Sequence, residues 1–88
     1  MNNFQTCSVL GLGYIGLPTA ALIANKGLKV IGIDINKKIV NSVNNGETHI
    51  IEPNLDSLVK RVVGNNFLKA QTSPCQSDIY LIAVPTPF

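Results

Sequence analysis

The sequence has 88 residues, of which 45% are hydrophobic and 14% are charged, and its formal net charge is +2. This composition excludes a mainly disordered chain and suits one compact domain or part of one. The seven lysine and arginine residues are scattered, so we expect no nucleic-acid partner. No apolar run is as long as a membrane helix, so we expect no membrane partner. No basic leader precedes the first apolar stretch, and we therefore expect a cytoplasmic location.

A buried strand is predicted over residues 6–10, and it runs directly into Gly11, Gly13 and Gly16. This G-x-G-x-x-G spacing between a strand and a helix is typical of a turn that holds a dinucleotide pyrophosphate. The first glycine allows a tight turn, the second lets the backbone approach the phosphates, and the third lets the helix pack against the strand. The free amides at the start of the helix favour an anion there.

A helix is predicted after the glycines, because Ile15, Thr19, Leu22 and Ile23 recur at helical spacing on one face and Gly27 is placed to end it. The next strand, over residues 29–34, is apolar and β-branched, as a buried strand should be.

Asp34 ends this second strand at about the distance from the glycines where a carboxylate accepts hydrogen bonds from the adenosine ribose. The carboxylate favours NAD over NADP, since it would repel a 2′-phosphate. Lys37 and Lys38 lie close by in the sequence and leave NADP open as an alternative. The alternative to a cofactor site is an ordinary turn followed by a strand that happens to end in an aspartate.

Two more helices and two more strands are predicted downstream. Asn36 caps the first of these helices and Asn45-Gly46 ends it, and Gly64 ends the second. The strands are predicted over residues 67–70 and 78–84, the latter apolar enough for a sheet centre covered on both faces. The fold class is therefore α/β, a Rossmann-like doubly wound parallel sheet, partial, with about four strands in the order 3-2-1-4.

The remaining residues of chemical interest give weak signals. Cys7 and Cys75 have neither the spacing of a metal site nor that of a redox pair, so we expect two reduced thiols. His49 and Glu52 lie in a polar loop, where an exposed histidine and a helix-start carboxylate are the simpler interpretation. The sequence therefore predicts no catalytic residue and no metal ligand. Thr86, between two prolines, either faces the cofactor or simply follows the end of a strand.

Four segments together resemble the N-terminal part of the UDP-glucose/GDP-mannose dehydrogenase family. They are Gly-Leu-Gly-Tyr-Ile-Gly-Leu-Pro at 11–18, Gly-Ile-Asp-Ile-Asn at 32–36, Gly-Glu-Thr-His-Ile-Ile-Glu-Pro at 46–53 and Ala-Val-Pro-Thr-Pro-Phe at 83–88. The last two are not general features of dinucleotide-binding folds, so the resemblance is more specific than the glycine pattern alone.

The resemblance implies an enzyme that oxidises the 6-hydroxymethyl group of a nucleotide sugar to a carboxylate with two NAD molecules, through a thioester. It implies that Tyr14 and Ile15 offer backbone contacts to the pyrophosphate, that Asp34 holds the ribose and that Thr86 touches the cofactor. In the family the catalytic cysteine and the UDP-sugar domain lie farther along the chain. We therefore expect residues 1–88 to be the N-terminal part of an NAD-binding domain that is inactive alone.

Two other functions are compatible with the same cofactor site. One is a regulatory module that binds a dinucleotide without chemistry, and the other is the cofactor domain of a hydroxyacid or phosphogluconate dehydrogenase, which residues 46–53 and 83–88 disfavour. The fourth predicted strand would also present an apolar edge with no strand beside it. We therefore expect the chain to self-associate through that edge.

Overall fold

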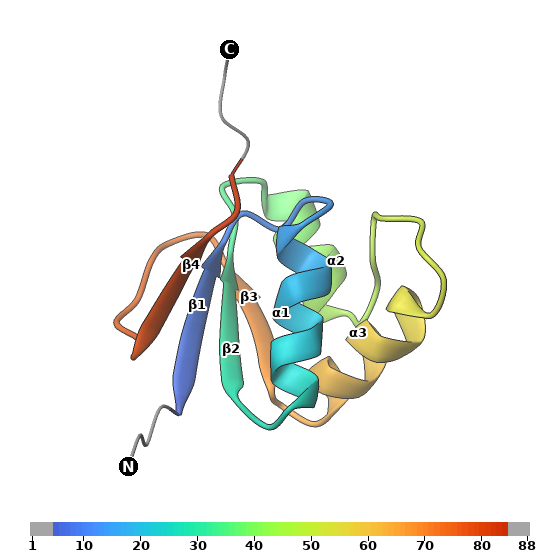
Figure 1. Cartoon of the computed structure of the whole chain (residues 1–88). Coiled ribbons are helices and arrows are strands. Elements are labelled where there is room, and N and C mark those ends of the chain that lie inside the picture. Colours follow the sequence, from blue (N-terminus) through green and yellow to red (C-terminus); the bar gives the residue numbers. More distant parts are fainter. Residues whose placement is uncertain (1–4, 85–88) are drawn as a thin grey trace.

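Four parallel strands form one sheet in the order β3-β2-β1-β4 (Figure 1), as the sequence predicts. The structure is a computed structural model, and it describes residues 5–84. The strands are β1 (Thr6–Leu10), β2 (Lys29–Ile33), β3 (Leu68–Gln71) and β4 (Ile79–Ile82). Leu10 at the end of β1 lies opposite Ile33 of β2 and Ile82 of β4, so these three strands end together at one edge of the sheet.

Three helices cover one face of this sheet (Figure 1). They are α1 (Gly16–Asn25), α2 (Lys37–Asn44) and α3 (Leu55–Gly64). The β1-to-β2 and β2-to-β3 crossovers both advance in the same direction across the sheet, so their right-handedness puts all three helices on the same side. No helix in the described part of the chain has the length and hydrophobicity to cross a membrane.

Helix α1 packs with a different face from the one its larger apolar residues suggest. Ile15 is 73% exposed and Leu22 is 56% exposed, and only Ile23 of the large residues in the predicted stripe packs against the core. The buried residues are Gly16, Leu17, Ala20, Ala21 and Ala24. The helix has no charged residue, so apolar periodicity does not distinguish its faces, and the small alanines allow the closer approach to the strands.

The ends of α2 and α3 follow from local chemistry. The Asn36 side chain caps α2 by accepting a hydrogen bond from the Lys38 amide at 3.0 Å, and Gly46 follows the helix with a φ of +75°. Helix α3 ends at Gly64, as predicted. The left-handed residue after α3 is Asn66, with a φ of +65°, because asparagine also tolerates this conformation.

The face of the sheet opposite the helices is only partly covered. Residues 72–78, which join β3 to β4, cross this face without forming a helix (Figure 1). The apolar sequence of β4 predicts a strand covered on both faces, and this prediction is wrong for the described residues. Ile82 is 74% exposed and Tyr80 is half exposed. Within residues 5–84, β4 is also an edge strand, with only β1 beside it.

The opposite edge strand, β3, has its outer side occupied by a side chain. The Ala70 amide donates a hydrogen bond to Asn44 Oδ1 and the Ala70 carbonyl oxygen accepts one from Asn44 Nδ2, both at 2.8 Å. Asn44, at the end of α2, thus pairs with β3 as the backbone of a neighbouring strand would. The two edges of the sheet differ, because in the described residues only β3 is protected in this way.

Candidate functional site

The glycine loop after β1 makes its turn because Gly11 takes a conformation that other residues rarely adopt. Its φ is +98°, and a Cβ at this position would lie 2.9 Å from the Ala83 carbonyl oxygen. The Gly11 amide donates a hydrogen bond of 2.7 Å to the Ile33 carbonyl oxygen, which ties the loop to the end of β2. Gly16 is equally restricted, since a Cβ there would overlap the Gly11 carbonyl oxygen. The first and third glycines are thus needed to form the loop itself.

Gly13 differs from these two glycines because, its chain neighbours aside, no atom of residues 5–84 lies within 4 Å of where its Cβ would be. A side chain here would enter open space beside the start of α1. Within residues 5–84, the structure gives no hydrogen-bond acceptor for the amides of Gly13, Tyr14 and Ile15. The first turn of α1 has no acidic residue and its N-cap has no side-chain hydrogen bond. Unpaired amides, the positive helix end and open space together suit an anion.

Asp34 lies directly beside this loop, and both of its carboxylate oxygens accept hydrogen bonds from backbone amides. Oδ2 accepts one from Leu12 at 3.0 Å, and Oδ1 accepts one from Asn36 at 2.9 Å. The carboxylate therefore joins the glycine loop to the turn after β2. Since a carboxylate has about four acceptor positions, about two remain for a ligand. The sequence predicted Asp34 as a ribose contact but not its contact with the loop, for which the sequence has no signal.

A groove lies on each side of the glycine loop, at the edge where β1, β2 and β4 end. The first, which we call the Asp34 groove, is lined by Leu10, Gly11, Ile33, Asp34, Ile35, Thr72, Pro74 and Val84. The second is lined by residues 13–15 and 82–84. Sequence analysis did not select Ile35, Thr72 or Pro74. Ile35 lies within the segment 32–36 but carries no signal of its own, whereas Thr72 and Pro74 belong to no motif and reach this edge only through the sheet order.

The other residues considered from the sequence lie away from this edge. Cys7 is buried on the helix-covered side of the sheet, where burial raises the pKa of its thiol, and Cys75 lies on the crossing segment. Both cysteines are free, as expected. His49 and Glu52 are exposed in the loop before α3 and line neither groove. Thr86, predicted to contact the cofactor, lies outside the described residues.

Sequence comparison identifies relatives over the whole chain. The model of the UDP-glucose/GDP-mannose dehydrogenase family, NAD binding domain, matches residues 5–88. The chain is 57% identical over 88 residues to a UDP-N-acetyl-D-mannosamine dehydrogenase from Campylobacter jejuni, covering 100% of this chain and 22% of that protein. It is 57% identical over 86 residues to the Escherichia coli K12 protein of the same name, covering 98% of this chain and 20% of the relative. The chain thus spans about a fifth of the curated relatives it matches.

Solved structures share the fold over the same region. The UDP-N-acetyl-mannosamine dehydrogenase Cap5O from Staphylococcus aureus superposes with a TM-score of 0.91 at 43% identity, covering 94% of this chain and 20% of that one. A GDP-mannose dehydrogenase from Pseudomonas aeruginosa, solved as a ternary complex, gives a TM-score of 0.88 at 32% identity over 92% of this chain and 20% of that one. These similarities and the glycine loop lead to one assignment. The chain belongs to the NAD-binding domain of the UDP-glucose/GDP-mannose dehydrogenase family.

Proposed function

We propose that the edge formed by β1, β2 and β4 binds NAD, with the pyrophosphate over Gly13 and the start of α1. The observation that supports this most directly is the space at Gly13 that the described residues leave open, beside the amides of Tyr14 and Ile15, which have no acceptor among those residues. Gly11 and Gly16 shape the loop, and the backbones of Tyr14 and Ile15 donate to the phosphates. We keep Thr86 as a proposed cofactor contact on the ground of the family resemblance.

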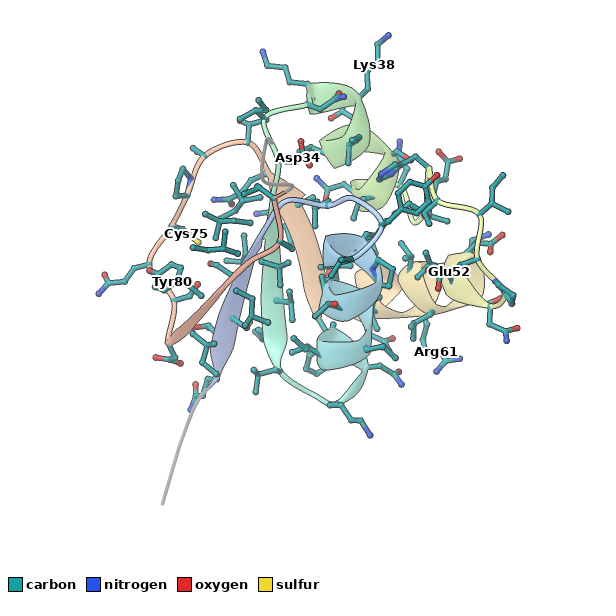
Figure 2. The ribbon with its side chains drawn as sticks, turned by 45° about the horizontal axis from the view of Figure 1, so that its top comes forward. Asp34, Lys38, Glu52, Arg61, Cys75 and Tyr80 are labelled. Carbon is teal, nitrogen blue, oxygen red and sulfur yellow. The ribbon has the colours of Figure 1, made fainter. Side chains whose placement is uncertain are left out.

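The adenosine ribose is proposed to lie against Asp34, whose free acceptor positions suit two neighbouring hydroxyl groups. A 2′-phosphate would place negative charge against this carboxylate. Figure 2 shows Lys38 extending outward from α2, away from Asp34, so this lysine is poorly placed to offset that repulsion. The site therefore favours NAD over NADP.

For the whole protein, we propose the reaction that the family resemblance implies, with the sugar that its relatives' names indicate. That reaction is the oxidation of UDP-N-acetyl-D-mannosamine at C6 to UDP-N-acetyl-D-mannosaminuronate, with two NAD molecules as acceptors. We propose that residues 1–88 contribute cofactor binding to it and that they bind NAD without turnover when alone. A regulatory module without catalysis is the alternative, and the 57% identity to dehydrogenases favours the enzyme. We also propose a cytoplasmic location, where NAD and nucleotide sugars are available.

Calorimetric titration of the 88-residue chain with NAD, NADP and AMP tests the cofactor proposal. We expect saturable binding of NAD, comparable binding of AMP and weaker binding of NADP. Gly13→Val is the test variant, because a Cβ at this position meets no described atom within 4 Å, chain neighbours aside, and the larger side chain would occupy the space proposed for the phosphate. Equal heats for wild type and variant, or tighter binding of NADP than of NAD, would contradict the proposal.

We also propose that the 88-residue chain self-associates through β4. The support is the contrast between its two sheet edges: Asn44 occupies the edge of β3, whereas β4 exposes Ile82 and, within residues 5–84, has no strand on its outer side. Unpaired apolar edges pair readily with one another. Sedimentation velocity should show association that Ile82→Lys abolishes and Ile51→Lys, on a remote and fully exposed isoleucine, leaves intact. A monomer at all concentrations would refute this proposal.

A further inference from the structure

We infer that Tyr80 is a positioning residue of the cofactor site, because its hydroxyl group holds one wall of the Asp34 groove in place. That wall belongs to residues 72–78, which we call the crossing segment and from which Thr72 and Pro74 line the groove. This inference rests on the proposed binding of NAD with its adenosine end at Asp34. Tyr80 lies outside the four segments that carry the family resemblance, so the resemblance gives it no role.

The crossing segment has no regular structure that would hold its shape. Residues 72–77 form neither a helix nor a strand, and within residues 5–84 none of them makes a backbone-to-backbone hydrogen bond. Thr72, Ser73 and Pro74 are all exposed, so burial does not fix them either. An exposed segment of this kind samples many conformations unless side chains restrain it. Its position at the groove therefore depends on side-chain hydrogen bonds.

Tyr80 supplies two of these hydrogen bonds from a single hydroxyl group. The hydroxyl accepts a hydrogen bond from the Ser77 amide at 2.8 Å and donates one to the Cys75 carbonyl oxygen at 3.1 Å. Figure 2 shows Tyr80 beside the part of the chain that carries Cys75. The hydroxyl thus restrains two consecutive peptide groups of the crossing segment.

These contacts reach the groove through Pro74, which directly precedes Cys75. On the other side of Pro74, the Gln71 side-chain amide donates a hydrogen bond to the Ser73 carbonyl oxygen at 2.7 Å. Pro74 therefore lies between two restrained peptide groups, and its own ring fixes its φ. Without the Tyr80 hydroxyl, only the Gln71 side would remain fixed in this way.

The register of β4 explains why Tyr80 can reach the crossing segment. Ile79 and Leu81 pack against the core, so Tyr80 between them points to the opposite face of the sheet, which the crossing segment covers. Tyr80 lies opposite Ser8 of β1, and the Ser8 hydroxyl forms a hydrogen bond with the Ser77 hydroxyl. Within residues 5–84, Tyr80 does not pack against the core cluster and is half exposed. The contacts of its hydroxyl are therefore with the crossing segment and not with the core.

The restraint matters for the ligand because the wall and the Asp34 carboxylate line the same groove. A ribose held by Asp34 carries its base in this groove, against the wall. A wall that is ordered before the ligand arrives lowers the entropic cost of binding. Tyr80 itself lines neither groove, so its effect on the adenosine end of NAD passes through the crossing segment.

Tyr80→Phe tests the inference, because it removes the hydroxyl and keeps the ring. Thr48→Val is the matched control: the Thr48 hydroxyl accepts a hydrogen bond from the Ile50 amide at 3.0 Å and donates one to the Ile50 carbonyl oxygen at 3.4 Å, and Thr48 lines neither groove. Calorimetric titration of the 88-residue chain with AMP and with NAD is the measurement. We expect Tyr80→Phe to bind both about fivefold more weakly than wild type, and Thr48→Val to bind both as wild type does.

Amide hydrogen exchange reports on the wall directly. Without ligand, the Ser77 amide should exchange faster in Tyr80→Phe than in wild type or Thr48→Val, because its acceptor is lost. Saturating AMP should slow this exchange in wild type, since the bound base orders the wall further. This second measurement needs no variant, so it decides the question even if Tyr80→Phe does not fold.

The outcomes separate this inference from the proposal beneath it. If wild type binds AMP but Tyr80→Phe binds it equally well, or if Thr48→Val loses the same affinity, Tyr80 does not position the site and NAD binding stands. A Ser77 amide that exchanges equally fast in free and AMP-saturated wild type would also overturn the inference. If wild type binds neither NAD nor AMP, the proposed function fails and the role of Tyr80 fails with it.

Discussion

The amide of Leu12 donates a 3.0 Å hydrogen bond to the carboxylate of Asp34, so the glycine loop after β1 is tied to the residue that ends β2. The other carboxylate oxygen accepts a hydrogen bond from the amide of Asn36, which is the N-cap residue of α2. One side chain thus orders two loops at the edge of the sheet before any ligand is present. In addition to its proposed contact with the ribose, Asp34 positions the glycine loop.

Replacing Asp34 by asparagine should therefore change the free protein as well as its affinity for NAD. The carboxamide has a single acceptor oxygen, so it cannot reproduce both hydrogen bonds. We expect the amide resonances of Leu12 and Asn36 to shift without ligand, and NAD to bind about tenfold more weakly, as for the loss of a charged hydrogen-bond acceptor. Asp56→Asn, on an exposed carboxylate in the first turn of α3, is the control. Unchanged loop resonances in Asp34→Asn would show that the side chain does not position the loop.

Alanine at the second and third glycines should separate binding from folding. Gly16→Ala places a methyl group against the Gly11 carbonyl oxygen and should lower the free energy of unfolding by about 2 kcal/mol or more, as overpacking of a core does. The methyl group of Gly13→Ala meets no atom of the part of the chain that the structure describes within 4 Å, its chain neighbours aside, so its melting temperature should match wild type while NAD binding weakens.

Gly64→Ala serves as the control for both glycine variants. It lies in α3, and among the described residues no atom outside its own helix backbone and chain neighbours is within 4 Å of where its Cβ would be, so the substitution should stabilise the protein by about 0.5–1 kcal/mol. Thermal unfolding and NAD titration of the three variants check these expectations. Equal loss of stability at Gly13 and Gly16 would contradict the division of roles.

Asp78 should make the fold sensitive to acid. Its carboxylate accepts hydrogen bonds from the amides of Gln5 and Thr6, at 2.9 and 3.1 Å, and these lower its pKa below the usual value. A carboxyl whose pKa is lower in the folded state stabilises the fold at pH values above its unfolded pKa, about 3.9, and loses that contribution as the pH falls through the folded pKa.

Asp78→Asn should therefore destabilise the protein at pH 7 and reduce the dependence of stability on pH below about pH 4. Urea unfolding between pH 2 and pH 7 measures both effects. Glu47→Gln, on an exposed residue, is the control and should lose stability below about pH 4 as wild type does. If Asp78→Asn lost stability at acid pH to the same extent as wild type, Asp78 would contribute nothing to the acid sensitivity.

Asn44 should stabilise the fold through its pair of hydrogen bonds to Ala70. Asn44→Ala leaves the edge of β3 unpaired and should lower the free energy of unfolding by about 1–2 kcal/mol, at about 1 kcal/mol for each net hydrogen bond. Asn41→Ala, on an exposed residue of the same helix, controls for helix propensity. Denaturant unfolding of both variants is the measurement, and equal stabilities would mean that the Asn44 contacts contribute nothing.

The strand order and the glycine loop could be predicted because each depends on local sequence and on a general rule of topology. Thr6–Leu10 is a short apolar run before the glycines, the order 3-2-1-4 is that of the doubly wound fold to which such a turn belongs, and right-handed crossovers then decide which face the helices cover. The core face of α1 could not be predicted in the same way. Leu22 and Leu17 are equally apolar, and only the close packing of Ala20 and Ala24 on the sheet decides which face is buried.

The candidate site was predictable only in part for a related reason. Gly13 and Asp34 belong to a pattern whose spacing reflects a fixed backbone geometry. Ile35 and Pro74 lie 39 residues apart and meet because β3 and β4 lie on opposite sides of the β1–β2 pair, so that the connection between them must cross the sheet face. A residue such as Pro74, which reaches the site only because this connection crosses the sheet face, has no motif in the sequence that would identify it.

The most direct test of the account is an NMR titration of the labelled 88-residue chain with NAD, following the amides of residues 11–16 and of residues 34–36. We expect saturable shifts at both groups of amides, larger for NAD than for NADP at equal concentration and reproduced at residues 34–36 by AMP. A well-dispersed spectrum in which neither group responds to NAD would show a folded domain without the proposed site and would contradict NAD binding at this edge of the sheet.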